Sequence, residues 1–168
     1  MSSIYLGAAI DLASSLNAFD EMNKIILDSE RFKKSLIFRP DTAWSNARNI
    51  AENETAINYL MQVNDFALIN ADLAVFFVSK NVFSAGVAHE IEKRLSVPRV
   101  TYIIAEKLGF YTMGQMNNAN RKHTFSRVYK TLEEFKNTFE EDFARDNKNF
   151  QDWKHYNVEH LRAAGVMI

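Results

Sequence analysis

The stretch NADLAVFFVSKNVFSAGVAHEIEKRL, residues 70–95, carries the side chains whose types and spacing are best suited to chemistry. A nearly unbroken apolar run, residues 73–78, predicts a strand buried on both faces. Ser84 then opens an amphipathic helix as its N-cap, and Gly86 lets the backbone approach a ligand closely. Glu90 falls in the second turn of that helix, near the carboxyl end of the strand, where open α/β sheets bind ligands. Glu90 is therefore a candidate catalytic carboxylate.

Strand-like and helix-like segments alternate around this unit. Strands are expected at residues 4–10, 35–38, 73–78 and 99–104, and helices at 12–32, 54–69, 84–95 and 131 to about 149. Thr131-Leu132-Glu133-Glu134 is a capping-box pattern. A turn is expected at 39–41, a polar connection at 42–53 and an irregular segment at 105–127. The order predicts one α/β domain, residues 1–168, with a mostly parallel sheet and a helical C-terminal extension from about residue 131.

Composition and charge exclude several classes of function. The 168 residues hold 20 Lys and Arg against 21 Asp and Glu, a net charge of −1, so no global field attracts a nucleic acid polymer or a membrane surface. There is no cysteine, which excludes disulfides, thiolate metal sites and a cysteine nucleophile. The four histidines lack metal-binding spacing, and we expect no metal and no organic cofactor.

Sequence fingerprints for two common α/β classes do not occur in the chain. Neither G-x-G-x-x-G nor G-x-x-x-x-G-K-[ST] is present, which counts against a dinucleotide oxidoreductase and a P-loop phosphotransferase. The first twelve residues lack the basic and apolar regions of a signal peptide, and no apolar run approaches the ~20 residues of a membrane span. We therefore expect a cytoplasmic protein.

Three motifs together resemble the nucleoside 2-deoxyribosyltransferase superfamily, which includes 5′-monophosphate N-glycosidases. They are IYLGAAI at residues 4–10, Asn64-Asp65 followed by Asp72, and SAGVAHE at residues 84–90. The resemblance covers roughly residues 4–105. It implies a flavodoxin-like (Rossmann-like) three-layer fold, cleavage of the N-glycosidic bond of a small-molecule nucleoside or nucleotide, and assembly into a homodimer or higher homo-oligomer.

The same resemblance assigns roles to individual residues. Glu90 would be the nucleophile that forms a glycosyl ester, and Tyr5 would lie beside it and hold it by hydrogen bonding. An acid in the pair Asn64-Asp65 would contact the base; the family spacing of eight before Asp72 falls on Asn64, with Asp65 one residue out of register. The substrate-binding set would also include Gly7 and Ala8.

Ser84 bears on the choice between nucleosides and nucleotides. Six residues before the nucleophile, nucleoside-using transferases carry an Asp, whereas the monophosphate hydrolases carry a Ser, and a helix start with a hydroxyl suits an anion. Ser84 therefore favours a 5′-monophosphate. The order Tyr5-Leu6-Gly7-Ala8 and the acidic Asp11 instead resemble the transferases, so transfer to a second base and hydrolysis both stay open.

Two further residues complete the expected substrate site. Trp44 could stack on a base or pack on the sheet. Asn117 lies where transferases send an Asn from a neighbouring subunit into the site.

Glu90 itself could be a surface residue paired with Arg94 at i+4. Two other functions stay open: an NAD glycohydrolase, and a nucleotide-sensing module that lost catalysis, which Asn64 in place of an acid would allow.

Overall fold

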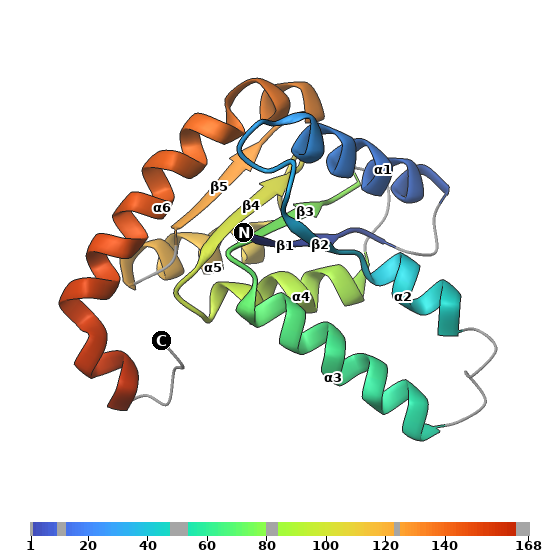
Figure 1. Cartoon of the computed structure of the whole chain (residues 1–168), viewed down its shortest axis with the longest axis horizontal. Coiled ribbons are helices and arrows are strands. Elements are labelled where there is room, and N and C mark those ends of the chain that lie inside the picture. The colour runs from blue at the N-terminus through green and yellow to red at the C-terminus, as the bar shows by residue number, and fades with distance from the viewer. Residues whose placement is uncertain (1, 10–12, 48–53, 80–83, 123–124, 164–168) are drawn as a thin grey trace.

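The computed structural model describes residues 2–9, 13–47, 54–79, 84–122 and 125–163 (Figure 1). Its strands are β1 (Ser3–Gly7), β2 (Leu36–Phe38), β3 (Leu73–Phe77), β4 (Val100–Ile104) and β5 (Phe125–Tyr129). Its helices are α1 (Ala13–Asp28), α2 (Pro40–Ala47), α3 (Glu54–Asn70), α4 (Ala85–Leu95), α5 (Phe110–Lys122) and α6 (Leu132–Ala163). Within the described residues, no helix is both long enough and apolar enough to cross a membrane.

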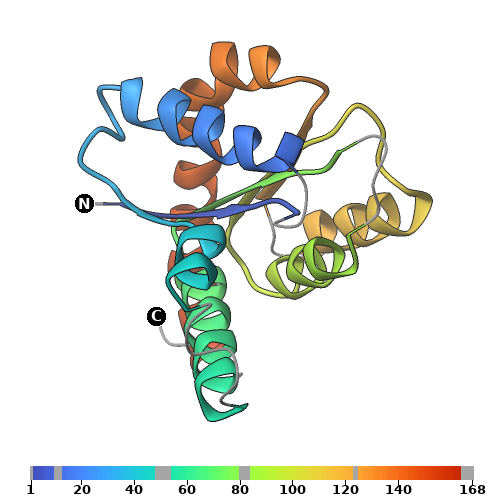
Figure 2. The same cartoon turned by 90° about the vertical axis from the view of Figure 1, so that its right-hand side faces the viewer.

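The five strands of the described chain form one sheet in the order β2-β1-β3-β4-β5, and all neighbouring strands run parallel. This is the flavodoxin-like strand order. Helix α1 and the first part of α6 cover one face, and α3, α4 and α5 cover the other (Figures 1 and 2). The predicted three-layer α/β fold is confirmed.

Alternation along the central strands divides the core into two layers. On β1, Ile4 and Leu6 pack with the apolar side chains of α1 and α6, whereas Tyr5 packs with those of α3, α4 and α5. On β3, four of the five residues are buried, because helices lie on both faces of a central parallel strand. The uninterrupted apolar run in the sequence reflects this position.

The expectation of an irregular segment at residues 105–127 is wrong, because it contains α5 and most of β5. Helix α5 has the sequence FYTMGQMNNANRK, in which glycine and asparagine are weak helix formers. Met116 is the buried one among its described side chains. Strand β5 lies at the sheet edge, where polar residues are tolerated, and pairs with β4 along its whole length. Tertiary packing therefore overrides weak local propensity here.

The turn expected at residues 39–41 is also wrong, since Pro40 begins α2. Proline suits the first helical position because its missing N–H would have no partner there. Asp41 follows in the first turn, where a carboxylate is favoured by the helix dipole. The polar connection is thus helical as far as Ala47, and residues 48–53 lie outside the described residues.

Helix α6 begins close to its predicted start and continues well beyond residue 149, to Ala163. Thr131 is confirmed as the N-cap, because the backbone N–H of Glu134 donates to Thr131 Oγ1 at 3.1 Å. The carboxylate of Glu134 accepts the backbone N–H of Lys130 at 2.6 Å, one residue before the bond of a standard capping box. Aromatic packing explains the longer helix: Phe150 is 5% exposed and meets Phe125 of β5 and Trp153 at centroid distances of 6.0 and 6.4 Å.

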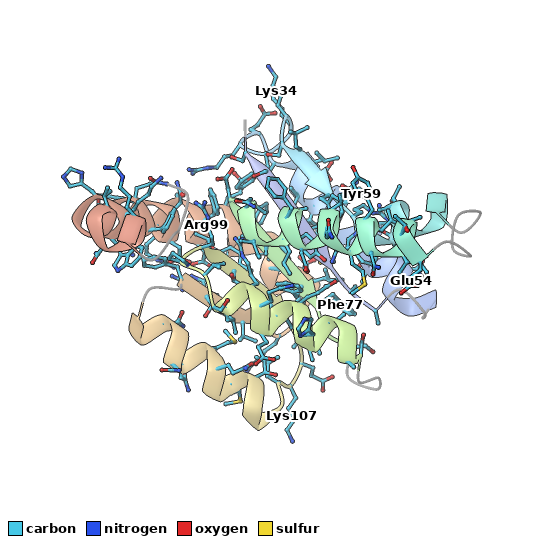
Figure 3. All side chains as sticks on the ribbon, turned by 90° about the horizontal axis from the view of Figure 1, so that it is seen from below. Lys34, Glu54, Tyr59, Phe77, Arg99 and Lys107 are labelled. Atoms are coloured by element: carbon cyan, nitrogen blue, oxygen red, sulfur yellow. The ribbon has the colours of Figure 1, made fainter. Side chains whose placement is uncertain are left out.

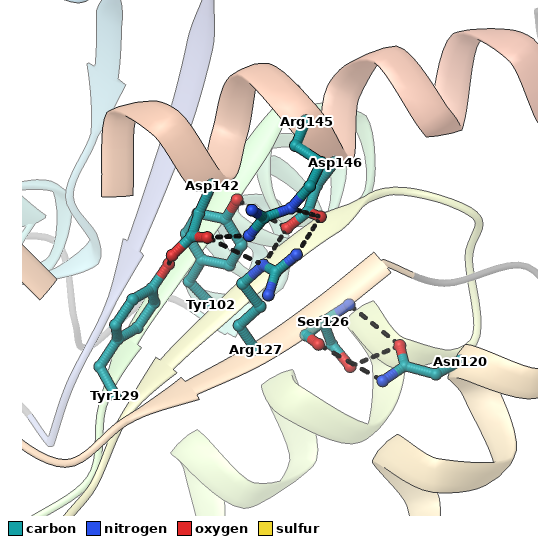
Figure 4. Close-up of polar contacts among 8 residues, drawn as sticks. All are labelled: Tyr102, Asn120, Ser126, Arg127, Tyr129, Asp142, Arg145 and Asp146. Carbon is teal, nitrogen blue, oxygen red and sulfur yellow. Dashed lines mark hydrogen bonds and ion pairs between the residues drawn. The ribbon is translucent and has the colours of Figure 1, made fainter. Parts of the chain in front are cut away.

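A polar cluster fastens α6 to the sheet (Figure 4). Asp146 is 4% exposed, accepts the hydroxyl of Tyr102 of β4 at 3.0 Å, and pairs with the guanidinium of Arg127 of β5. Asp142, one turn earlier, accepts the hydroxyl of Tyr129 at 2.9 Å. These bonds satisfy polar groups that would otherwise be costly to bury. They fix α6 over strands β4 and β5.

Candidate active site

The candidate site lies where β1 and β3 end, on the face covered by α3 and α4. From β1 the chain continues to β2 on one side of β1 and then to β3 on the other side. Ligands of such sheets bind at the carboxyl ends of the strands at this switch point. Gly7 is the last residue of β1 and pairs with Phe76 of β3. A Cβ atom at Gly7 would lie 3.2 Å from Glu90 Oε2 and would collide with the Phe76 ring. The absence of a side chain at Gly7 therefore makes room for Glu90.

A hydrogen-bonded chain of three side chains joins three elements at this point. The hydroxyl of Tyr5, on β1, donates to Asn64 Oδ1 on α3 at 3.0 Å. Asn64 Nδ2 in turn donates to Glu90 Oε1 on α4 at 3.2 Å. Tyr5 is fully buried and stacks on Phe38 of β2, with centroids 5.7 Å apart and an interplanar angle of 14°. A rigid aromatic side chain thus sets the position of Asn64, and Asn64 orients the carboxylate.

The surroundings of Glu90 favour its protonated form. Burial raises the pKa of Glu90, and the charge of Asp65 adds to that effect. The polar groups of Tyr5 and Asn64 act in the opposite direction but do not cancel it. Burial and the charge of Glu90 together raise the pKa of Tyr5, so Tyr5 stays a neutral donor. The site therefore pairs a partly desolvated carboxylate with neutral hydrogen-bond donors.

Between the two neighbours Asn64 and Asp65, it is Asn64 that the structure brings to Glu90. Asp65 also faces α4, but it forms an ion pair with Lys93, three residues after Glu90. Successive helical residues are rotated by about 100°, so adjacent side chains cannot share one contact. Asp65 is consequently the ion-pair partner of Lys93 where α3 packs on α4.

Arg94 does not pair with Glu90 but is buried between helix α3 and the sheet. Its guanidinium donates to the carbonyls of Leu68 and Ala71 at 2.8 Å, to those of Ile69 and Val100 at 3.0 Å, and to Thr101 Oγ1 at 3.3 Å. A cation at these carbonyls complements the negative end of the α3 dipole. Arg94 lies one turn after Glu90 on α4, and Leu68 lies one turn after Asn64 on α3. The bond between Arg94 and Leu68 therefore holds the two helices in the register that brings Asn64 to Glu90.

Ser84 is confirmed as the N-cap of α4, with its hydroxyl oxygen accepting the N–H of Val87 at 3.4 Å. It also lines a cavity between α4 and α5. Gly86 is exposed, and a Cβ atom there would meet Ser84 Oγ alone, at 3.8 Å. Contacts within the described chain therefore do not require glycine at position 86.

The structure places the side chains of Ala8 and Asn117 apart from Glu90. Ala8 is buried in the core layer of α1 and α6, so its side chain faces away from the site. Asn117 is exposed on α5, which lies on the opposite side of α4 from α3 (Figure 3). Trp44 belongs to α2, and its side chain lies outside the described residues. A single chain therefore unites Tyr5, Gly7, Asn64 and Glu90.

Two features of the site were not expected from the sequence. Asn64 bridges Tyr5 and Glu90 with both ends of its amide, and residues from the supposedly irregular segment line the cavity beside Ser84. The spacing of eight residues before Asp72 singles out Asn64, but no sequence signal marks its two hydrogen bonds or the cavity, because each contact joins distant parts of the chain. Within the described residues, no group of three His, Cys, Asp or Glu side chains is placed to hold a metal ion.

Comparison with known proteins gives one informative similarity. No protein-family model and no curated protein matches the chain. Among solved structures, a 2-deoxyribosyltransferase from Bacillus psychrosaccharolyticus aligns with a TM-score of 0.61 at 12% identity, over 81% of this chain and 91% of that one. A CMP N-glycosidase from Clostridium botulinum aligns over 82% of this chain and 98% of that one at 12% identity, but at a TM-score of 0.49.

The first alignment defines the class of fold. This chain has the α/β fold of the 2-deoxyribosyltransferase. The alignment shows a shared fold. At 12% identity it does not transfer the roles of individual residues. The chemistry must therefore be argued from the side chains of this chain.

Proposed function

We propose that this protein cleaves the N-glycosidic bond of a 2′-deoxynucleoside or its 5′-monophosphate through a covalent adduct on Glu90. The observation that carries this proposal is the chain of hydrogen bonds from Tyr5 through Asn64 to Glu90 at the carboxyl edge of β1. A carboxylate held by neutral donors at a ligand-binding edge suits attack on a carbon that develops positive charge. The fold shared with a 2-deoxyribosyltransferase agrees with this chemistry.

The geometry distinguishes the two carboxylate oxygens. Asn64 holds Oε1, while Oε2 lies beside Gly7, where no side chain intervenes. We assign Oε2 as the nucleophile. It forms a bond to the anomeric carbon as the carbon–nitrogen bond breaks, and the electron pair leaves with the base. Water or a second base then attacks the same carbon and releases the carboxylate.

Protonation of the departing base does not fall to the Asn64-Asp65 pair. An amide cannot supply a proton, and Asp65 is ion-paired with Lys93. Asn64 is therefore a positioning residue for Glu90. The base takes its proton from solvent as it leaves.

The amide at Asn64 favours a second candidate, cleavage of the nicotinamide bond of NAD. The nicotinamide nitrogen is already cationic, so the base leaves as a neutral molecule and needs no proton donor. A nucleotide-binding module without turnover is the non-enzymatic alternative. The NAD enzyme would release nicotinamide, whereas the module would bind its nucleotide and release nothing.

Base release from a panel of nucleosides, 5′-monophosphates and NAD, with and without an added free base, tests these functions. Wild type is compared with Glu90→Gln, and Glu92→Gln, an exposed residue of the same helix, is the matched control. We expect release that Glu90→Gln abolishes and Glu92→Gln retains, with a deoxyribosyl adduct on Glu90 detectable by intact mass. Release that survives Glu90→Gln contradicts the mechanism, and binding without release supports the module.

We also propose that the chain forms a homodimer through α3. This helix exposes Tyr59, Met61 and Phe66, with 65%, 54% and 64% of their surfaces accessible. Tyr59 and Phe66 are seven residues apart and lie on one face of α3, whereas Met61 lies on the other side, and large apolar side chains exposed on one face mark interaction sites. Light scattering of wild type and Phe66→Glu tests this: we expect a dimer that the substitution dissociates, and a monomeric wild type contradicts it.

A further inference from the structure

An ion pair lies directly beside the contact between Asn64 and Glu90, where α3 and α4 run next to each other (Figure 3). Asp65 follows Asn64 on α3, and Lys93 comes three residues after Glu90 on α4. The carboxylate of Asp65 and the ammonium group of Lys93 form a salt bridge between the two helices. The two contacts therefore cross from α3 to α4 side by side. The reaction steps proposed for Glu90 use neither of these two charges.

The carboxyl group of Glu90 is sensitive to the charge of Asp65. Burial raises the pKa of Glu90, and the side chains with the largest further influence are Tyr5 of β1, Asn64 and Asp65 of α3, and His89 of α4. Hydrogen bonding by Tyr5 and Asn64 lowers the pKa, and the charge of His89 lowers it too. Asp65 raises the pKa, because a second negative charge nearby disfavours ionisation. Of these four side chains, Asp65 alone opposes the charged form of the nucleophile.

The position of Lys93 allows it to counteract Asp65 in two ways. Its ammonium group adds a positive charge at the carboxylate of Asp65, so the field of the pair at Glu90 is weaker than the field of a lone carboxylate. The salt bridge also holds the carboxylate of Asp65 at Lys93, which leaves Asn64 as the α3 partner of Glu90. Attack on the sugar requires the charged form of Glu90, so both effects favour the reaction.

We propose that Lys93 is a positioning residue for the reaction, which acts through its salt bridge with Asp65 and keeps the negative charge of Asp65 from disfavouring the carboxylate form of Glu90. The proposal rests on the proposed function, in which that carboxylate attacks the anomeric carbon. Lys93 contacts no substrate in this role. Its effect is to extend the activity of the enzyme toward lower pH.

Three variants separate Lys93 from the charge that it neutralises. Lys93→Met removes the ammonium group and leaves Asp65 unopposed, whereas Asp65→Asn removes the negative charge. The double variant removes both charges, so its Glu90 meets neither of them. Lys33→Met is the matched control, because Lys33 forms an exposed ion pair with Glu30 in the segment that precedes β2. That segment lies at the amino end of the strand, away from the candidate site.

The experiment measures the pH profile of kcat/KM for base release from a 2′-deoxynucleoside. We expect the acidic limb of Lys93→Met to move to higher pH by about half a unit, a roughly 3-fold loss of kcat/KM at pH values below the limb. Asp65→Asn should move the limb to lower pH by a similar amount. The double variant should return close to wild type, and Lys33→Met should match wild type. Thermal melting at the same pH values verifies folding, and a general loss of structure would not move the limb in opposite directions.

The possible outcomes separate this proposal from the function on which it rests. Base release with an acidic limb that stays in place in Lys93→Met, or moves to lower pH, overturns the role of Lys93 and leaves the N-glycosidase standing. If no substrate releases base, the N-glycosidase fails, and NMR titration of the isotope-labelled carboxyl group of Glu90, assigned with Glu90→Gln, decides the role of the ion pair. Titration at higher pH in Lys93→Met supports that role, and an unchanged titration overturns it.

Discussion

Asn64 donates its side-chain amide to Glu90 Oε1 at 3.2 Å, although the two residues are 26 positions apart in the chain. The other end of the same amide accepts the hydroxyl of Tyr5. An asparagine thus stands beside the candidate nucleophile and fixes its orientation. These two hydrogen bonds give Asn64 a positioning role.

Asn64→Asp should raise the pKa of Glu90 further, because a second carboxylate beside it disfavours the charged form. The acidic limb of the pH profile of kcat/KM should then move to higher pH by about one unit or more. Asn64→Leu, which lacks both charge and hydrogen bonds, separates charge from loss of positioning. An unchanged limb in Asn64→Asp would show that Asn64 does not contact the working carboxylate.

Glu90→Gln should abolish base release and stabilise the fold. Loss of a nucleophile lowers kcat on the order of 10⁴–10⁶-fold. Burial raises the pKa of Glu90 above its ordinary value of 4.5, so its contribution to stability is complete below that pH and is lost as the pH rises through the folded pKa. Thermal melting should therefore show Glu90→Gln more stable than wild type at pH 7, with the difference vanishing near pH 4. Equal stability at both pH values would contradict the raised pKa.

Tyr5→Phe should preserve the stacked contact with Phe38 while removing the hydrogen bond to Asn64. The free energy of unfolding should fall by about 0.5–1.5 kcal/mol, the net contribution of one such bond. The hydroxyl also lowers the pKa of Glu90, so its removal should move the acidic limb of the activity profile upward. Denaturant titration and the pH profile measure the two effects, and a silent substitution would place Tyr5 in the core alone.

Arg94→Met should be strongly destabilising, because it leaves buried carbonyls of Leu68, Ala71 and Val100 without a donor. We expect a loss of more than about 3 kcal/mol in the free energy of unfolding by urea titration. Lys93→Met is the matched control on the same helix, since its partly exposed ion pair with Asp65 is worth about 0–1 kcal/mol. Similar losses in both variants would show that the buried hydrogen bonds of Arg94 stabilise the fold no more than the partly exposed ion pair of Lys93 does.

Asp146→Ala should weaken the attachment of α6 to the sheet, since it strips Tyr102 and Arg127 of a common acceptor (Figure 4). The loss leaves the buried hydroxyl of Tyr102 without its acceptor, which costs about 1–3 kcal/mol, whereas Arg127 is 34% exposed and keeps Asp142 nearby. The exposed Asp152 of the same helix gives the control variant Asp152→Ala. Urea titration that shows no difference between the two would contradict the structural role of Asp146.

Local patterns in the sequence determined the elements with strong apolar signals. The unbroken run of β3 is buried on both faces, and Ser84 caps α4 as its position before an amphipathic segment predicts. Thr131 likewise caps the start of α6. These elements are predictable because their signals lie within a few residues of one another.

Only the tertiary structure decided the features that depend on distant contacts. Helix α5 and strand β5 form despite glycine and asparagine in one and polar residues in the other, since β4 supplies the partner for β5. Helix α6 continues beyond residue 149 because Phe150 packs on Phe125. Local propensity is weak in each case, and burial against the sheet outweighs it.

The candidate site shows the same division. Its position after β3, with Glu90 in the second turn of the following helix, follows from the sequence, because the strand and the helix are adjacent. The choice between Asn64 and Asp65 does not, because both occur in one helix and only the docking of α3 on α4 turns Asn64 to the carboxylate and Asp65 to Lys93. Adjacent residues differ by about 100° around a helix, so the packing of α3 on α4 decides which of the two residues faces Glu90.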